Sequence, residues 1–86
     1  MFALIFEKRV FKDLDELSAH EVAKIAVQFE RLRANPFPAG CRKLSGKENI
    51  FRIRQGNYRI IYSVVIDQRK IFVLAVSHRK DAYHRV

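Results

Sequence analysis

The segment at residues 50–62, IFRIRQGNYRIIY, constrains the fold most, because it is typical of a β-hairpin that turns at Gly56 and Asn57. A two-residue loop at this point sets Arg54 directly opposite Arg59 on the neighbouring strand. Like charges that face each other across a sheet are destabilising. We therefore expect this pair of arginines to bind an anion.

The same register divides the hairpin into two faces, because successive side chains of a strand point to opposite sides. The apolar face carries Phe51, Ile53, Tyr58, Ile60 and Tyr62. The basic face carries Arg52, Arg54 and Arg59. We expect another layer of structure to cover the apolar face and the arginine side to stay open or groove-like.

The periodicity upstream of the hairpin predicts a strand and then two helices. Residues 2–6 are apolar and aromatic, as in a short strand. Apolar residues then recur at helical spacing over 10–17 and 22–32. Ser18 with Glu21 three positions later is a capping-box pattern, so a second helix should begin near Ser18. Pro36 should end that helix, because a proline disfavours helix in the residue before it.

The remaining chain predicts a loop at 37–48 and three strands at about 49–54, 58–66 and 70–78, with the second turn near 67–69. The expected fold is α+β in the order βααβββ, a single domain over residues 1–86. Two N-terminal helices pack on a mostly antiparallel four-stranded sheet. If Ile66 pairs with Ile71, Arg59 lies opposite His78, and Arg54, Arg59 and His78 form a row across three strands. Arg79 and Tyr83 follow that row in the sequence.

The charge is strongly one-sided. The 86 residues carry a net charge of +8, and all of the excess lies from Arg42 onward, where eleven Lys and Arg face three Asp and Glu. Such a surface suits a polyanion, most often nucleic acid, although a membrane surface or an acidic protein would also fit. Cys41 is the only cysteine, which excludes an internal disulfide and fits a reducing cytoplasm. The apolar run at residues 2–6 is too short to span a membrane.

A basic row beside tyrosine and histidine suits a phosphodiester substrate. Guanidinium groups bind phosphate oxygens in bidentate geometry and stabilise the charge that develops on phosphorus. RNA carries its own nucleophile, the 2′-hydroxyl, so its cleavage needs cations, a base and an acid, and no metal. The few acidic residues of the basic half are scattered, which argues against a metal site, and no cofactor-binding motif occurs. The candidate catalytic residues are Arg54, Arg59, His78, Arg79 and Tyr83. The candidate RNA-binding residues are Arg42, Lys43, Lys47, Arg52, Lys80 and His84.

Three segments carry a resemblance that covers essentially the whole chain: the Leu44-Ser45-Gly46 loop, FRIRQGNYRIIY and VSHRKDAY. Together with the order βααβββ, they resemble the RelE/ParE superfamily of toxins from bacterial toxin–antitoxin systems. The resemblance implies an mRNA interferase of the RelE type, which cleaves mRNA in the ribosomal A site by 2′-hydroxyl attack without a metal. The partners it implies are a cognate antitoxin protein, mRNA on the ribosome, and operator DNA reached through the antitoxin.

The resemblance also implies roles for single residues. Arg59 would hold the scissile phosphate, Arg79 would stabilise charge or assist the leaving group, and Tyr83 would act on or stack near the attacking nucleotide. The best-known relatives use lysine at the positions of Arg52 and Arg54. Arginine is effectively never deprotonated, so the base would be Tyr83, His78 or His84, or the 2′-hydroxyl would be activated mainly by electrostatics.

Two other functions stay open on the sequence alone. A ParE-like toxin poisons DNA gyrase through a protein interface and needs no ribonuclease site, but such chains usually lack the full arginine and tyrosine set. A noncatalytic nucleic-acid-binding module would fit the charge, although it has little use for Tyr83 beside Arg79.

Overall fold

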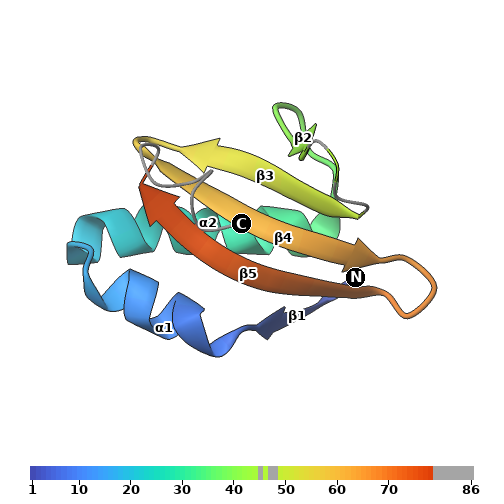
Figure 1. Ribbon diagram of the computed structural model, residues 1–86, viewed down its shortest axis with the longest axis horizontal. Helices are drawn as coiled ribbons and strands as arrows, with labels where there is room; N and C mark the ends of the chain where they lie inside the picture. The colour runs from blue at the N-terminus through green and yellow to red at the C-terminus, as the bar shows by residue number, and fades with distance from the viewer. Residues whose placement is uncertain (45, 47–48, 79–86) are drawn as a thin grey trace.

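The fold was determined from a computed structural model that describes residues 1–44, 46 and 49–78 (Figure 1). Its elements are β1 (Ala3–Phe6), α1 (Lys8–Asp15), α2 (Ala19–Ala34), β2 (Arg42–Lys43), β3 (Ile50–Gln55), β4 (Tyr58–Val65) and β5 (Lys70–His78). The strands form one sheet in the order β1-β5-β4-β3-β2, in which β1 runs parallel to β5 and the other pairs are antiparallel. The α+β class is confirmed. The sheet has five strands and not four, because two residues of the expected loop pair with β3.

The second helix begins and ends where its sequence predicts. The Ser18 hydroxyl accepts a hydrogen bond from the Glu21 backbone N–H at 3.2 Å, which satisfies one of the free donors of the first turn. Asn35, directly before Pro36, has an extended backbone with φ −149°, so the helix stops at Ala34. Both signals are local, and this explains why they could be read without the rest of the fold.

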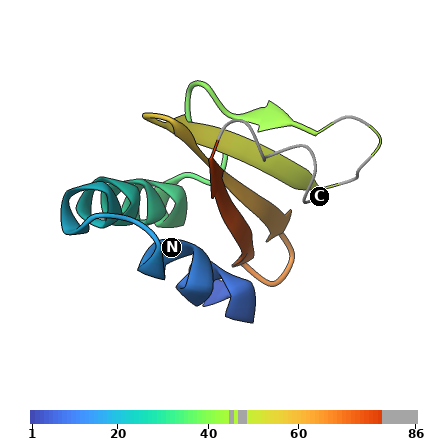
Figure 2. The same cartoon turned by 60° about the vertical axis from the view of Figure 1, so that its left-hand side comes forward.

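The two helices lie on one side of the sheet and cover its apolar face (Figure 2). The core between the layers consists of buried aliphatic and aromatic side chains: Val10, Ile25, Phe29, Leu32, Ile53, Ile60, Tyr62, Val64, Ile71, Val73 and Val76. The Tyr62 hydroxyl donates a hydrogen bond to the Pro36 carbonyl at 2.7 Å, which joins the sheet to the end of α2. The predicted apolar face of the hairpin is therefore the face that the helices bury.

Helix α1 protects the part of β5 that β1 does not reach. The pairing of β1 with β5 ends at Val73. Beyond that point the buried Asp13 side chain accepts a hydrogen bond from the Val76 backbone N–H at 3.0 Å. Asp13 also lies 3.7 Å from the Arg9 guanidinium. A helix side chain thus takes the place of a strand neighbour along the free edge of β5.

The first hairpin register is confirmed, since Arg54 pairs with Arg59 and Ile53 with Ile60. The predicted register of the last strand is wrong. The turn at residues 66–69 joins Val65 to Lys70, one residue earlier on each strand than the expected pairing of Ile66 with Ile71. It is closed by a hydrogen bond from the Arg69 N–H to the Ile66 carbonyl at 3.0 Å.

A β-bulge between Ile61 and Tyr62 then shifts the pairing of β4 and β5 by one residue. Together with the displaced turn, the bulge places Arg59 opposite Ser77 and Tyr58 opposite His78. The row of Arg54, Arg59 and His78 that the sequence suggested therefore does not exist, because an odd change in register moves a side chain to the other face.

Candidate nucleic-acid interface

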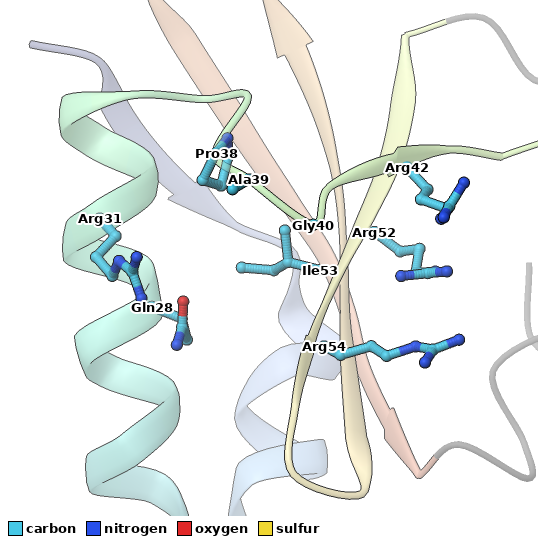
Figure 3. Close-up of a pocket in the computed structure, with 9 residues that line it drawn as sticks. All are labelled: Gln28, Arg31, Pro38, Ala39, Gly40, Arg42, Arg52, Ile53 and Arg54. Atoms are coloured by element: carbon cyan, nitrogen blue, oxygen red, sulfur yellow. The ribbon is translucent and has the colours of Figure 1, made fainter.

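The arginine face is the group of four side chains, Arg42, Arg52, Arg54 and Arg59, on the side of the sheet away from the helices. Two rungs of the sheet hold them. Arg42 of β2 pairs with Arg52 of β3, and Arg54 of β3 pairs with Arg59 of β4. Figure 3 shows the side chains of Arg42, Arg52 and Arg54 pointing to the same side, away from α2. Residues from three strands are thus gathered by the pairing alone.

Three of these arginines, Arg42, Arg52 and Arg54, make no ion pair with a carboxylate of the described residues. The two ion pairs found there are those of Arg9 with Asp13 and of Arg33 with Glu30, and neither involves Arg42, Arg52 or Arg54. Arg52 is only 7% exposed, whereas Arg42 and Arg54 are exposed. Positive charges held close together at a partly desolvated surface attract an anion more strongly than charges free in water.

The floor beside the arginines is made of small or apolar side chains. The Arg42–Arg52 rung continues to Ile61 and Ala75, and the Arg54–Arg59 rung continues to Ser77. All three of these floor residues are at least 98% buried. The buried Ser77 hydroxyl has no hydrogen-bond partner among the described residues. Sequence reasoning missed Ser77, because only the bulge in the last pair of strands puts it on this face.

A small cavity lies where the arginine face meets the tip of the hairpin. It has a volume of about 190 Å³ and is lined by Arg54, Gly56, Tyr58 and Arg59. Gly56 adopts a positive φ of 61°, which the tight turn requires and which glycine adopts at little cost. A Cβ atom at this position would have no neighbouring heavy atom within 4 Å. The two facing arginines thus border an open space in which a phosphate could contact both.

Two of the predicted site residues lie on the opposite face of the sheet. The His78 ring packs edge-to-face on Tyr58, with ring centroids 5.5 Å apart, and Tyr58 packs against the core. Burial, and then the Glu21 carboxylate, raise the pKa of Tyr58 above its ordinary value. Lys43 pairs with Phe51, a residue of the helix-covered face, so it points away from Arg42. His78 and Lys43 therefore do not join the arginine face.

The remaining predicted site residues, Lys47, Arg79, Lys80, Tyr83 and His84, lie outside the described residues. Within residues 1–44, 46 and 49–78, no three His, Cys, Asp or Glu side chains are grouped so that they could hold a metal ion. No helix in this same part of the chain is long and apolar enough to cross a membrane.

Sequence comparison assigns the family. The sequence model described as the ParE toxin of the type II toxin–antitoxin system parDE matches residues 4–83. The chain belongs to the RelE/ParE superfamily of toxins. A RelE1 protein of Methanocaldococcus jannaschii is 34% identical over 85 residues, which cover 95% of this chain and 94% of the relative. The toxin RelE3 of the same organism is 31% identical over 84 residues, 93% of each chain.

Solved structures agree with this assignment. The toxin in the archaeal RelE–RelB complex of Pyrococcus horikoshii superposes with a TM-score of 0.81 at 28% identity, over 91% of this chain and 94% of that one. The isolated E. coli RelE toxin superposes with a TM-score of 0.79 at 20% identity, over 99% of this chain and 98% of that one, which shows a shared fold. The family model bears the ParE name and the relatives bear the RelE name. The chain is thus a type II toxin of this superfamily, and its target is a separate question.

Proposed function

We propose that this toxin is a metal-independent endoribonuclease that cleaves mRNA on the ribosome and thereby inhibits translation. The observation that carries the proposal is the arginine face, where Arg54 directly opposes Arg59 and Arg42 opposes Arg52. A sheet tolerates two such like-charged rungs most readily when an anion binds between them. The relatives named as RelE toxins favour RNA as that anion.

In this proposal the arginine face binds the RNA backbone around the scissile bond. Arg59, with Arg54 opposite, holds the scissile phosphate and stabilises the charge that develops when the 2′-oxygen attacks phosphorus. The bond from phosphorus to the 5′-oxygen then breaks, and the leaving oxygen takes up a proton. Arg79 and Tyr83, assigned from the family resemblance, assist the leaving group and the attacking nucleotide.

The arginines are unsuited to act as the general base that removes the 2′-hydroxyl proton, because a guanidinium does not give up its own proton near neutral pH. His78 packs on Tyr58 behind the sheet, away from the arginine face. We therefore assign proton transfer to Tyr83, with His84 as the alternative. His78 then has a structural role at the end of β5.

The proposed physiological partner is a cognate antitoxin protein. The superposed toxins from Pyrococcus horikoshii and Methanococcus jannaschii were both solved in complex with RelB, and the latter is 32% identical to this chain. A protein that covers the arginine face would block RNA binding directly. We also propose that the toxin–antitoxin complex reaches operator DNA through the antitoxin.

The rival function is inhibition of DNA gyrase, which the ParE name of the matching family favours. Primer extension on a translated message after induction of the toxin separates the two. Cuts within codons support the ribonuclease. Intact mRNA together with trapped gyrase–DNA complexes would overturn it.

Substitution of the two assigned residues beyond β5 tests the site itself. We expect Arg79→Ala or Tyr83→Phe to abolish growth arrest, because each removes a group that contacts the reacting atoms. Loss of one such group lowers turnover about 10² to 10³-fold. Circular dichroism and antitoxin binding of the purified variants check that the fold is intact. A double variant that stays fully toxic would show that the proposed site is wrong.

A further inference from the structure

A cavity lies at the edge of the sheet, between α2 and β3. It has a volume of about 350 Å³, which is within the range of ligand-binding pockets. Its lining comes from α2, from the segment before β2, and from β2 and β3: Gln28, Arg31, Pro38, Ala39, Gly40, Arg42, Arg52, Ile53 and Arg54. Four of these nine residues are arginines and none is acidic. The proposed cleavage site accounts for three of the arginines but not for Arg31.

Arg31 approaches the cavity from the layer opposite to the other arginines. In Figure 3, Arg31 and Gln28 lie on α2, whereas Arg42 and Arg54 point away from α2, to the far side of the sheet. Gln28 is fixed in this position, because its side-chain Nε2 donates a hydrogen bond to the side-chain Oε1 of Gln55 at 2.7 Å. Arg31 is exposed and makes no ion pair with a carboxylate of the described residues. Its charge is therefore available to a ligand.

The edge of β3 is open at Arg54, between the side chains of α2 and the arginine face. Strand β2 pairs with β3 at residues 51 and 52. The Leu44 N–H also donates to the Ile50 carbonyl at 2.9 Å. Because backbone groups of a strand alternate in direction, the N–H and C=O of Arg54 point to the same edge as those of Ile50 and Arg52. No residue of β2 pairs with Arg54, so its N–H can donate to a ligand.

The rim of the cavity leaves room for a ligand to approach the backbone. Gly40 has a φ of 89°, and a Cβ atom at this position would have no neighbouring heavy atom within 4 Å. A ligand in the cavity can thus contact the Arg31 guanidinium of α2 and the Arg54 backbone N–H of β3, while the guanidinium groups of Arg42 and Arg54 lie past the strand edge on the arginine face. A guanidinium group and a backbone N–H donor at one cavity together suit a tetrahedral anion.

We infer that this cavity binds a second backbone phosphate of the same single-stranded RNA, one or more nucleotides away from the scissile bond. The inference rests on the proposed ribonuclease function. Arg42 and Arg54 belong to both the cavity lining and the arginine face. An RNA strand bound on that face can therefore continue across the edge of β3 to Arg31. An electropositive path that follows the backbone is the general means by which proteins hold single strands.

An acidic peptide is the other class of ligand that such a surface could take, by adding a strand to the edge of β3. The geometry favours RNA, because Arg54 is the one residue of β3 past its pairing with β2 whose backbone points to this edge. Peptide recognition by strand addition depends on a series of main-chain hydrogen bonds. A phosphate needs one N–H and one or two guanidinium groups.

The test compares Arg31→Ala with Arg33→Ala in the full-length chain. Both residues lie in the last turn of α2, but Arg33 is paired with Glu30 at 3.2 Å and does not line the cavity. The probes are an octanucleotide and a dinucleotide, each 2′-O-methylated so that cleavage cannot occur. We expect Arg31→Ala to weaken octanucleotide binding about tenfold and to lower the slope of log K against log salt by about 0.7. Dinucleotide binding stays unchanged, Arg31→Lys keeps most of the affinity, and Arg33→Ala resembles the wild type.

The outcomes distinguish this inference from the proposed function. If Arg59→Ala weakens binding of both RNAs while Arg31→Ala weakens neither, the second phosphate site is wrong and RNA binding at the arginine face stands. If Arg31→Ala weakens the binding of a polyglutamate peptide but not the binding of RNA, the cavity is a peptide site and the inference is overturned. If the wild-type chain binds neither RNA, the proposed function fails together with the inference.

Discussion

At the scale of single residues, Tyr62 shows how one side chain can join two layers. Its ring is fully buried and stacks on Phe51, with centroids 5.9 Å apart, and its hydroxyl bonds to the Pro36 carbonyl. Burial first, and the neighbouring Cys41 second, raise the pKa of Tyr62 far above its ordinary value. Ionisation of this hydroxyl in the folded protein is therefore strongly disfavoured.

This shift predicts a loss of stability in alkaline solution. The folded-state pKa of Tyr62 lies above the unfolded value of about 10. Below that pH, Tyr62 keeps its proton in both the folded and the unfolded chain, so its contribution to the free energy of unfolding is fully present. At higher pH the unfolded chain ionises while the folded chain does not, so the free energy of unfolding falls by up to about 1.4 kcal/mol per pH unit.

Denaturant titrations of the wild type and Tyr62→Phe between pH 8 and 11 measure this effect. At pH 8 the variant should be less stable by about 1 kcal/mol, because the Pro36 carbonyl loses its donor. The difference in the free energy of unfolding between the two proteins should narrow as the pH rises above 10. The other titrating groups affect both proteins alike. Parallel curves across the whole range would show that Tyr62 ionises equally well in the folded protein.

At the scale of elements, the ends of β5 are set by contacts with its neighbours. The residues from Ala75 onward lie past the end of β1, and the Asp13 carboxylate of α1 accepts the Val76 N–H in place of a strand. The β-bulge in the same region brings Ser77 under Arg59 and sends His78 to the other face. One helix side chain and one bulge thus decide which residues of β5 belong to the arginine face.

Loss of the Asp13 carboxylate should destabilise the protein. Asp13→Ala leaves the Val76 N–H buried without its acceptor, at a cost of about 2 kcal/mol in the free energy of unfolding. Asp15→Ala is the matched control, because Asp15 is an exposed residue of the same helix. Its effect should stay within about 0.5 kcal/mol. Urea titrations of the three proteins measure the difference, and equal stability of the two variants would argue against the bond to Val76.

At the scale of the whole molecule, the two faces of the sheet have different roles. The helices bury one face, and the described part of the other face concentrates arginines on β2, β3 and β4. The net charge of +8 is a property of the whole chain, but the direction of each side chain decides which charges can act on one ligand. Long-range attraction follows the total charge, whereas binding follows the arrangement.

Arg42 and Lys43 test this distinction, because they are neighbours in β2 that point to opposite faces. Arg42→Glu and Lys43→Glu change the net charge by the same amount. We expect Arg42→Glu to lower affinity for the 2′-O-methylated octanucleotide at least tenfold, and Lys43→Glu to change it by less than about threefold. Fluorescence anisotropy at two salt concentrations measures both. Equal losses would mean that overall charge, and not the arginine face, governs RNA binding.

The sequence by itself determined the parts of this protein that depend on near neighbours. The capping box at Ser18, the stop before Pro36 and the pairing of Arg54 with Arg59 were all predictable, because each is fixed by a few adjacent residues. The α+β order and the apolar face of the hairpin followed from periodicity. These features were enough to place Arg52, Arg54 and Arg59 together on one face.

The tertiary structure decided what depends on contacts between distant segments. The position of the turn before Lys70 and the bulge at Ile61 set the register of β5, and this register places Ser77, and not His78, opposite Arg59. A strand changes face with a shift of one residue, and no local pattern marks where such a shift will occur. The short strand β2 and the cavity that joins Arg31 to the arginine face likewise exist only because the chain returns to the edge of β3.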